Sequence, residues 1–139
     1  MFERLLLAVD GSEGSRRAGE VATELARLSG GEVIVCHVTE AEPEMSRGGL
    51  DPGEAPEHGE GVATFYGNAL EDVGVRARIV MRVASHSHVA SQIVEVAREE
   101  DVSVIVMGSR GLSDWSAAII GSIAHKVLHL ADRPVIVAR

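Results

Sequence analysis

The chain has very few aromatic residues, since Phe, Trp and Tyr together make up 3% of its 139 residues. A core with so few rings has to be built from Val, Ile, Leu and Ala, which suits the buried strands of a parallel sheet. The chain also has a single cysteine, so no disulfide can form within it. Because Cys36 ends the apolar run Val33-Ile34-Val35-Cys36, we interpret it as a buried core residue rather than a reactive thiol.

Targeting segments and an excess of positive charge are lacking too. The start, Met1-Phe2-Glu3-Arg4-Leu5, shows no basic leader or cleavage site, and no apolar stretch approaches the length of a membrane span. We therefore expect a cytoplasmic protein with no membrane partner. The formal net charge of -8 repels phosphate backbones, so nucleic acid is not an expected partner. A nucleotide is still compatible with this charge, because a few backbone amides and a divalent cation act at short range.

Residue sets typical of catalysis are also missing from the sequence. No nucleophile has an obvious His and acidic partner, and there is neither a Gly-x-x-x-x-Gly-Lys-Ser/Thr loop nor a lysine in the glycine-rich turn at 108–111. We therefore expect a protein that is not an enzyme, or a slow one at most.

The sequence does contain a regular alternation of aliphatic runs with amphipathic stripes. The chain is long enough for one domain, residues 1–139. Runs of β-branched and aliphatic residues predict strands at 5–9, 32–38, 75–83, 102–107 and 134–138. Amphipathic stripes predict helices at 15–29, 89–100 and 122–130, and a weaker stripe predicts one at 62–72. Such alternation indicates an α/β fold with a parallel sheet and helices on both faces.

The segment 40–61 does not follow this alternation. It combines acidic residues with five glycines and three prolines and leaves little apolar surface to bury. We predict a mobile loop there.

Two loops that follow predicted strands carry residues suited to a ligand. Ligands of open parallel sheets bind outside the carboxyl ends of the strands, near the point where the strand order reverses. The first loop, Val9-Asp10-Gly11-Ser12, offers a carboxylate and a hydroxyl, and the second is Gly108-Ser109-Arg110-Gly111, followed nine residues later by Gly121-Ser122 at a helix start. Glycines expose backbone amides and a helix start adds partial positive charge, so we interpret this stretch as a triphosphate cradle. An ordinary pair of turns is the alternative.

These segments resemble the universal stress protein family over essentially the whole chain. The matching stretches are 5–13 (LLLAVDGSE), 35–38 (VCHV), 104–112 (VIVMGSRGL), 121–124 (GSIA) and 133–137 (RPVIV). The glycine spacing resembles that of the family's ATP-binding branch. The resemblance implies an open five-stranded parallel sheet of order 3-2-1-4-5, a Rossmann-like fold of the adenine nucleotide alpha hydrolase type. It also implies a homodimer paired along residues 134–138.

Carried over residue by residue, the resemblance implies an ATP site, occupied together with Mg or Mn. Asp10 and the backbone near Ala8 and Val38 would face the adenosine, and Asp10 would lie near the ribose or the metal. The phosphates would be surrounded by Gly108, Gly111, Gly121, Ser122 and Ile123. Arg110, between the two turn glycines, is a further candidate to pair with a phosphate, with simple exposure to solvent as the alternative.

The sequence departs from the family pattern around the third long helix and in the last one. Residues 84–88 (ASHSH) stand where relatives usually carry a glycine, and Ala124-His125 stands where they often carry a hydroxyl and an acidic residue. The pairs His86 with His88 and His125 with His129 are interpreted as solvated side chains rather than metal ligands.

Three functions follow from these observations. The first is a dimeric, ATP-binding regulatory module of the stress response that acts on a protein partner. The second is an interaction protein in which the pocket is vestigial, and the third is a slow ATP hydrolase that uses Asp10 as a metal or water ligand.

Overall fold

The computed structural model describes residues 1–41, 56–109 and 120–139. Five strands and four helices alternate through these residues, with one 3-10 turn before the third helix. In chain order the elements are β1 (Arg4–Ala8), α1 (Glu13–Ser29), β2 (Glu32–Glu40), α2 (Pro56–Asp72), β3 (Arg76–Ala84), η1 (His86–His88), α3 (Val89–Glu99), β4 (Val104–Gly108), α4 (Ser122–Leu130) and β5 (Val135–Ala138).

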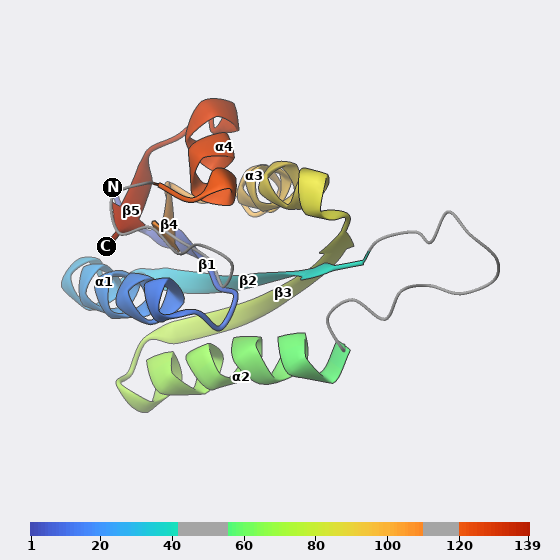
Figure 1. Ribbon diagram of the computed structural model, residues 1–139. Helices are drawn as coiled ribbons and strands as arrows, with labels where there is room; N and C mark the ends of the chain where they lie inside the picture. The colour runs from blue at the N-terminus through green and yellow to red at the C-terminus, as the bar shows by residue number, and fades with distance from the viewer. Residues whose placement is uncertain (42–55, 110–119) are drawn as a thin grey trace, which may run out of the picture.

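The strands form one parallel sheet in the order β3-β2-β1-β4-β5. Helices α1 and α2 cover one face of this sheet, and α3 and α4 cover the other (Figure 1). The predicted α/β class, the strand order implied by the resemblance and the two covered faces are thereby confirmed. Strands β2 and β3 lie on one side of β1, and β4 and β5 lie on the other. The strand order therefore reverses between β1 and β4.

Alternating side chains of the strands feed two separate apolar cores. In β1, Leu5 and Leu7 pack with α1 and α2, whereas Leu6 and Ala8 pack with α3 and α4. Successive side chains of a strand point to opposite faces, so a strand buried on both faces reads as a continuous apolar run. This is why the aliphatic runs were sufficient to locate the strands.

The helix α2 begins earlier than the apolar pattern predicts. It starts at Pro56 rather than at residue 62, and β2 continues to Glu40, so the prediction of a loop over 40–61 is wrong for residues 40 and 56–61. The physical reason is tertiary packing: Gly59 lies directly against His37 and Thr39 of β2, and Ala63 is fully buried. Contacts of this kind stabilise a helical turn whose composition alone does not favour it. The remainder of that predicted loop, residues 42–55, lies outside the described residues.

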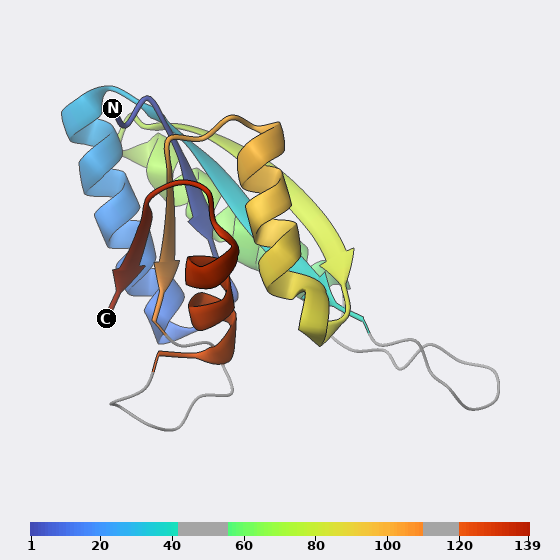
Figure 2. The ribbon, with the colours of Figure 1, turned by 90° about the horizontal axis from the view of Figure 1, so that it is seen from above.

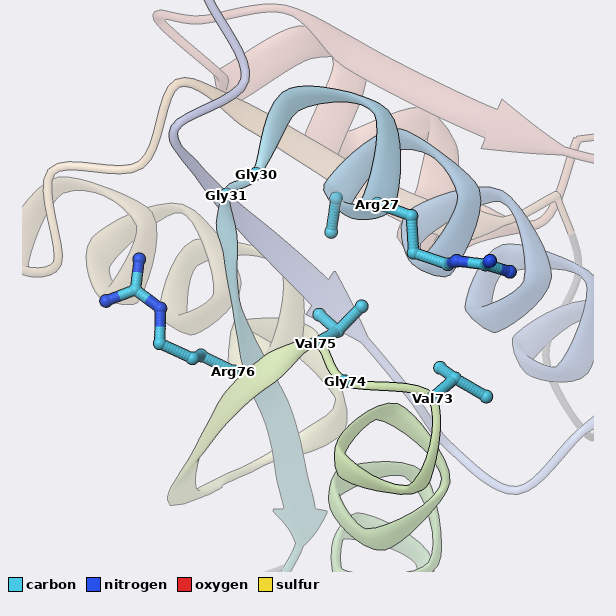
Figure 3. Close-up of a pocket in the computed structure, with 8 residues that line it drawn as sticks. Arg27, Gly30, Gly31, Val73, Gly74, Val75 and Arg76 are labelled. Carbon is cyan, nitrogen blue, oxygen red and sulfur yellow. The ribbon is translucent and has the colours of Figure 1, made fainter.

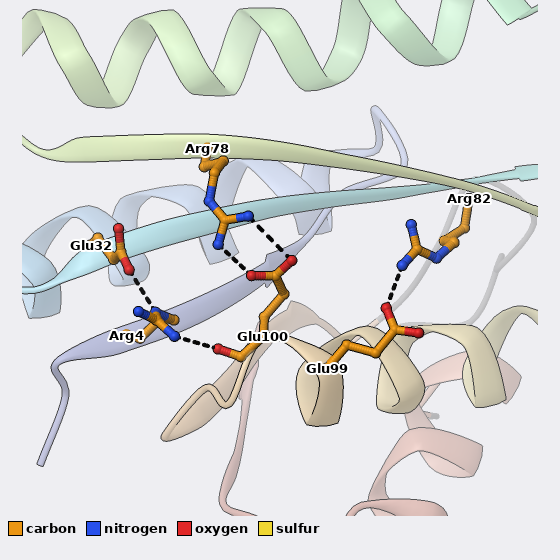
Figure 4. Close-up of polar contacts among 6 residues, drawn as sticks. All are labelled: Arg4, Glu32, Arg78, Arg82, Glu99 and Glu100. Carbon is orange, nitrogen blue, oxygen red and sulfur yellow. Dashed lines mark hydrogen bonds and ion pairs between the residues drawn. The ribbon is translucent and has the colours of Figure 1, made fainter.

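Charged side chains join the end of α3 to the strands on its face of the sheet (Figure 4). Arg4 donates to Glu32 at 2.5 Å and to the backbone carbonyl of Glu100 at 2.7 Å. Arg78 pairs with Glu100, and Arg82 pairs with Glu99. Ion pairs at a surface contribute little one by one, but Arg4 also supplies a donor to the end of α3, where carbonyl groups lack helical partners.

None of the helices in the described part of the chain has the length and apolar character needed to cross a membrane.

Candidate functional site

The loops singled out in the sequence lie at one edge of the sheet. Strand β1 ends at Ala8 and its neighbour β4 ends at Gly108, with Ala8 in register with Met107. We call this end of the sheet the carboxyl edge. The start of α4 lies at the same end of the molecule as the tips of β4 and β5 (Figure 2). The carboxyl edge therefore combines the reversal of strand order with a helix start, as the sequence predicts.

Asp10 organises the loop in which it lies. Its Oδ1 atom accepts hydrogen bonds from the backbone N–H of Ser12 at 3.0 Å and from the hydroxyl of Ser15 at 2.7 Å. The Ser15 oxygen in turn accepts from the backbone N–H of Asp10 at 2.8 Å, and Ser12 caps α1 by accepting from the N–H of Ser15. Gly11 has a φ of +81°, which a residue with a side chain rarely adopts. These contacts hold the Asp10 loop, residues 9–12, in one defined shape.

Gly108 is required by packing at the end of β4. A Cβ atom on Gly108 would lie 2.5 Å from the carbonyl carbon of Gly14 and 2.8 Å from its Cα. Gly14 is in the first turn of α1, so β4 and α1 meet backbone to backbone. This contact brings the Asp10 loop close to the residues that follow β4.

Gly121 joins the start of α4 to the end of β4. Its N–H donates to the carbonyl of Ser109 at 2.6 Å, and the N–H of Ser109 donates to the carbonyl of Ala138 at 2.7 Å. Gly121 is the N-cap residue of α4 and provides no side-chain cap. Ser122, the first residue of the helix, is exposed, and Ile123 is partly buried against the core on this face.

The structure thus brings Asp10, Gly108, Gly121, Ser122 and Ile123 to one edge. Two other predicted residues, Arg110 and Gly111, lie outside the described residues. Ala8 and Val38 are each 8% exposed and belong to the core beneath α3 and α4, so they can offer a ligand little beyond their backbone. Val38 lies past the end of β1, because β1 pairs with β2 only as far as Cys36, whereas β3 pairs with β2 as far as Glu40.

No local pattern in the sequence predicts a site role for His37, which is 2% exposed and whose Nδ1 atom lies 2.8 Å from the carbonyl oxygen of Val9. Its signal in the sequence is a polar residue inside an otherwise apolar strand. Gly59 of α2 packs on the other side of the ring. The start of α2 thereby becomes part of the surroundings of the Asp10 loop, and a Cβ on Gly11 would lie 3.2 Å from Cγ2 of Val62.

Asp10 adds negative charge at this edge. Burial raises the pKa of the Tyr66 hydroxyl above its usual 10.0, and the negative charge of Asp10 raises it further. Tyr66 lies on α2 and packs against Gly19 of α1. An anionic ligand near Asp10 would meet the same negative charge, so a cation has to accompany it or it has to bind closer to the start of α4.

Among the residues that the structure describes, no group of three or more His, Cys, Asp and Glu side chains could hold a metal ion. Within those residues, Asp10 is therefore not part of a ready-made cluster of such ligands. Mg²⁺ is usually bound by one or two carboxylates together with water and the phosphates of a substrate, and one carboxylate fits that pattern.

A hollow of about 280 Å³ lies at the opposite end of the sheet, between the C-terminal ends of α1 and α2 (Figure 3). Its two arginines, Arg27 and Arg76, point away from each other. The N–H groups of Gly31, Gly74 and Val75 in its wall already donate to carbonyls of α1 and α2. Helix C-termini carry partial negative charge, so this hollow is unsuited to a phosphate. Its lining residues are Ala26, Arg27, Gly30, Gly31, Val73, Gly74, Val75 and Arg76.

Comparison with known proteins places the whole chain in one family. The model of the universal stress protein family matches residues 1–139. The universal stress protein YxiE of Bacillus subtilis is 30% identical over 149 residues, and the alignment covers 100% of both chains.

Solved structures share the fold. The structure of MJ0577, a universal stress protein of Methanocaldococcus jannaschii, matches with a TM-score of 0.81 at 23% identity and covers 99% of this chain and 96% of that one. A universal stress protein from Archaeoglobus fulgidus, solved in complex with dAMP, matches with a TM-score of 0.74 at 24% identity and covers 100% and 98% of the two chains.

Proposed function

The chain belongs to the universal stress protein family, and from this we propose that it binds ATP at the carboxyl edge as a dimeric regulatory module. The nucleotide lies across the reversal of strand order between β1 and β4, with its phosphates at the start of α4 and its adenosine toward β2. Binding, rather than rapid turnover, is the activity.

The observation that carries this proposal is the hydrogen bond from the Gly121 N–H to the Ser109 carbonyl, at 2.6 Å. It holds the start of α4 at the end of β4. The first N–H groups of a helix lack partners within the helix and carry partial positive charge, which suits a phosphate. Because Gly121 caps α4 without a side chain, no side-chain oxygen competes for these N–H groups from the cap position.

Each predicted residue has a role in this arrangement. Ser122 adds an exposed hydroxyl and the N–H groups of Ser122 and Ile123 face the phosphates, while Gly108 keeps β4 close to α1. Arg110 and Gly111 complete the phosphate cradle. The backbone near Ala8 and Val38 contacts the adenosine, since β2 extends beyond the end of β1 there.

Asp10 is the residue that would hold the ribose or a Mg²⁺ or Mn²⁺ ion bound with the phosphates. Its Oδ1 atom accepts hydrogen bonds from the N–H of Ser12 and the hydroxyl of Ser15, so the carboxylate is fixed in orientation while its second oxygen supplies the ligand. The metal neutralises the charge that Asp10 and the phosphates bring together.

The relative from Archaeoglobus fulgidus was solved with dAMP, which supports an adenine nucleotide as the ligand of this fold. We further propose that the homodimer forms through residues 134–138. The strand β5 is an outermost strand of the sheet, with one side unpaired among the residues that the structure describes, and Val135, Ile136 and Val137 are only partly buried. Pairing of β5 with β5 of a second copy would cover these three residues.

An interaction protein with a vestigial pocket is the second candidate. The observation that favours it is that polar groups near this end of the sheet pair with each other: His86 lies 3.1 Å from the Glu40 carboxylate, and Lys126 donates to the carbonyl of Ser87 at 2.8 Å. A slow ATP hydrolase is the third candidate, with Asp10 as its metal or water ligand.

Calorimetry on nucleotide-stripped protein tests the proposal. We expect saturable binding of Mg-ATP and weaker binding of AMP, because AMP lacks the phosphates that reach α4. Purified protein examined by native mass spectrometry should carry adenine nucleotide. Binding of neither nucleotide would support the vestigial pocket instead, and phosphate release that falls in an Asp10→Ala variant would support the hydrolase.

A further inference from the structure

His37 is a buried imidazole that none of the proposed nucleotide contacts uses. It lies in β2 with only 2% of its surface exposed, among Val35, Cys36 and Val38. A polar group in such surroundings is costly unless it is hydrogen-bonded. Its Nδ1 atom lies 2.8 Å from the carbonyl oxygen of Val9. Because a carbonyl only accepts, Nδ1 carries the proton and donates it.

The bond partner, Val9, is the last residue before Asp10. The backbone N–H of Val9 donates to the carbonyl of Cys36 at 2.9 Å, which continues the pairing of β1 with β2. The carbonyl of Val9 is held by the His37 ring. Both backbone groups of Val9 are therefore bound to β2, and the imidazole extends the β1–β2 pairing by one contact at the point where the chain turns into the Asp10 loop.

The ring is held from its other side by α2. A Cβ on Gly59 would lie 2.7 Å from Cδ2 and 2.8 Å from Nε2 of His37. Atoms closer than about 3 Å cannot both be accommodated without movement, so the absence of a side chain at residue 59 is what allows the ring to stay in place.

We propose that His37 is a positioning residue, which sets the direction of the Asp10 carboxylate toward the ribose or metal of bound ATP by fixing the carbonyl of Val9. This inference rests on the proposed function. It predicts that changes at His37 act on the nucleotide through Asp10 and not through the phosphate-binding residues of α4.

A double-mutant cycle tests the proposal, with binding of Mg-ATP, and of tripolyphosphate in the absence of divalent metal, measured by calorimetry. His37→Leu should weaken ATP binding about tenfold, because the Val9 carbonyl loses its donor. His37→Asn, whose amide N–H can replace that of Nδ1, should restore most of this loss. Asp10→Asn keeps the Oδ1 acceptor but loses the charge, and it should have little further effect in the His37→Leu protein. Binding of tripolyphosphate should be unchanged by His37→Leu.

A substitution in α2 tests the same proposal while leaving His37 itself unchanged. Gly59→Ala presses a methyl group against His37 and should weaken ATP binding, whereas Gly61→Ala, two residues later in the same helix with no atom within 4 Å of its Cβ, should not. Equal binding by these two variants, or full additivity of the His37 and Asp10 changes, would overturn the inference. Wild-type protein that binds neither ATP nor tripolyphosphate would instead refute the proposed function, and this inference with it.

Discussion

Gly108 and Gly14 are in direct backbone contact, since a Cβ on Gly108 would come within 2.5 Å of the carbonyl carbon of Gly14. The end of a central strand is thereby pressed against the first turn of α1. From its place in a glycine-rich turn, Gly108 is predicted to expose its amide to phosphate. The structure adds a second requirement, because no side chain fits between β4 and α1 at this point.

We predict that Gly108→Ala lowers the free energy of unfolding by about 2–4 kcal/mol, since the new methyl group meets backbone rather than a flexible side chain. Urea denaturation followed by circular dichroism measures the change. Gly61→Ala is the matched control: residue 61 is an exposed position of α2 with open space around it, so alanine should stabilise the protein by about 0.5–1 kcal/mol. A Gly108→Ala protein as stable as wild type would show that β4 and α1 can separate without cost.

We predict that Ser122→Asp weakens ATP binding without destabilising the folded protein. A carboxylate in the first turn of α4 interacts favourably with the helix dipole, so the protein should be as stable as wild type or up to about 1 kcal/mol more stable. The same charge repels phosphate, and affinity for Mg-ATP should fall by about tenfold or more. Ser122→Asn, which is polar and uncharged, is the control. Undiminished ATP affinity in the Asp variant would place the phosphates elsewhere.

We predict that Cys36 does not react in the folded protein. Burial raises the pKa of its thiol to about 12, so at pH 8 only on the order of one thiol in ten thousand is ionised. A thiol reagent added to native protein at pH 8 should give no absorbance change over minutes, and full reaction should follow at once in guanidinium. Rapid labelling without denaturant would contradict the burial of this residue.

We predict that Asp132 stabilises the protein at neutral pH but not in strong acid. Hydrogen bonds from Arg133 and then from Arg98 hold its pKa at about 2, below the usual 3.8. A depressed carboxylate pKa favours the folded state above the unfolded pKa, and this contribution fades as pH falls from about 4 toward 2. Asp132→Asn should therefore lower the urea midpoint at pH 6 and have a smaller effect at pH 2.5. An effect that is equal at both pH values would mean that the ionised carboxylate contributes nothing to stability.

Most of the fold could be predicted from the sequence, because strands buried on both faces and amphipathic helices have distinct periods. The helix predicted at 122–130 matches α4, and the Gly30-Gly31 pair ends α1 as expected, with Gly30 in the left-handed region at a φ of +69°. The start of α2 was missed, because its first turns are stabilised by contact of Gly59 with β2 and not by an apolar stripe of their own.

The candidate site could be predicted only in part. The sequence places Asp10, Gly121 and Ser122 together at the carboxyl edge, because loops after strands and helix starts can be located from local patterns; their contact with a ligand stays a prediction. His37 could not be assigned a role from its position in an apolar strand, since its partner, the Val9 carbonyl, belongs to another strand. Gly59 was likewise assigned to a loop, and its contact with the His37 ring appears only once α2 lies on the sheet.

The sequence by itself determined the alternation of strands and helices, the composition of the two cores and the residues at which most elements end. These properties depend on neighbours within one or two turns along the chain. The family resemblance implied that β4 lies beside β1, but only the tertiary structure decided that Gly108 meets Gly14 and that Gly121 bonds to Ser109. Such contacts join residues whose proximity follows from strand order and helix packing, which depend on the free energy of the whole domain and not on any local pattern.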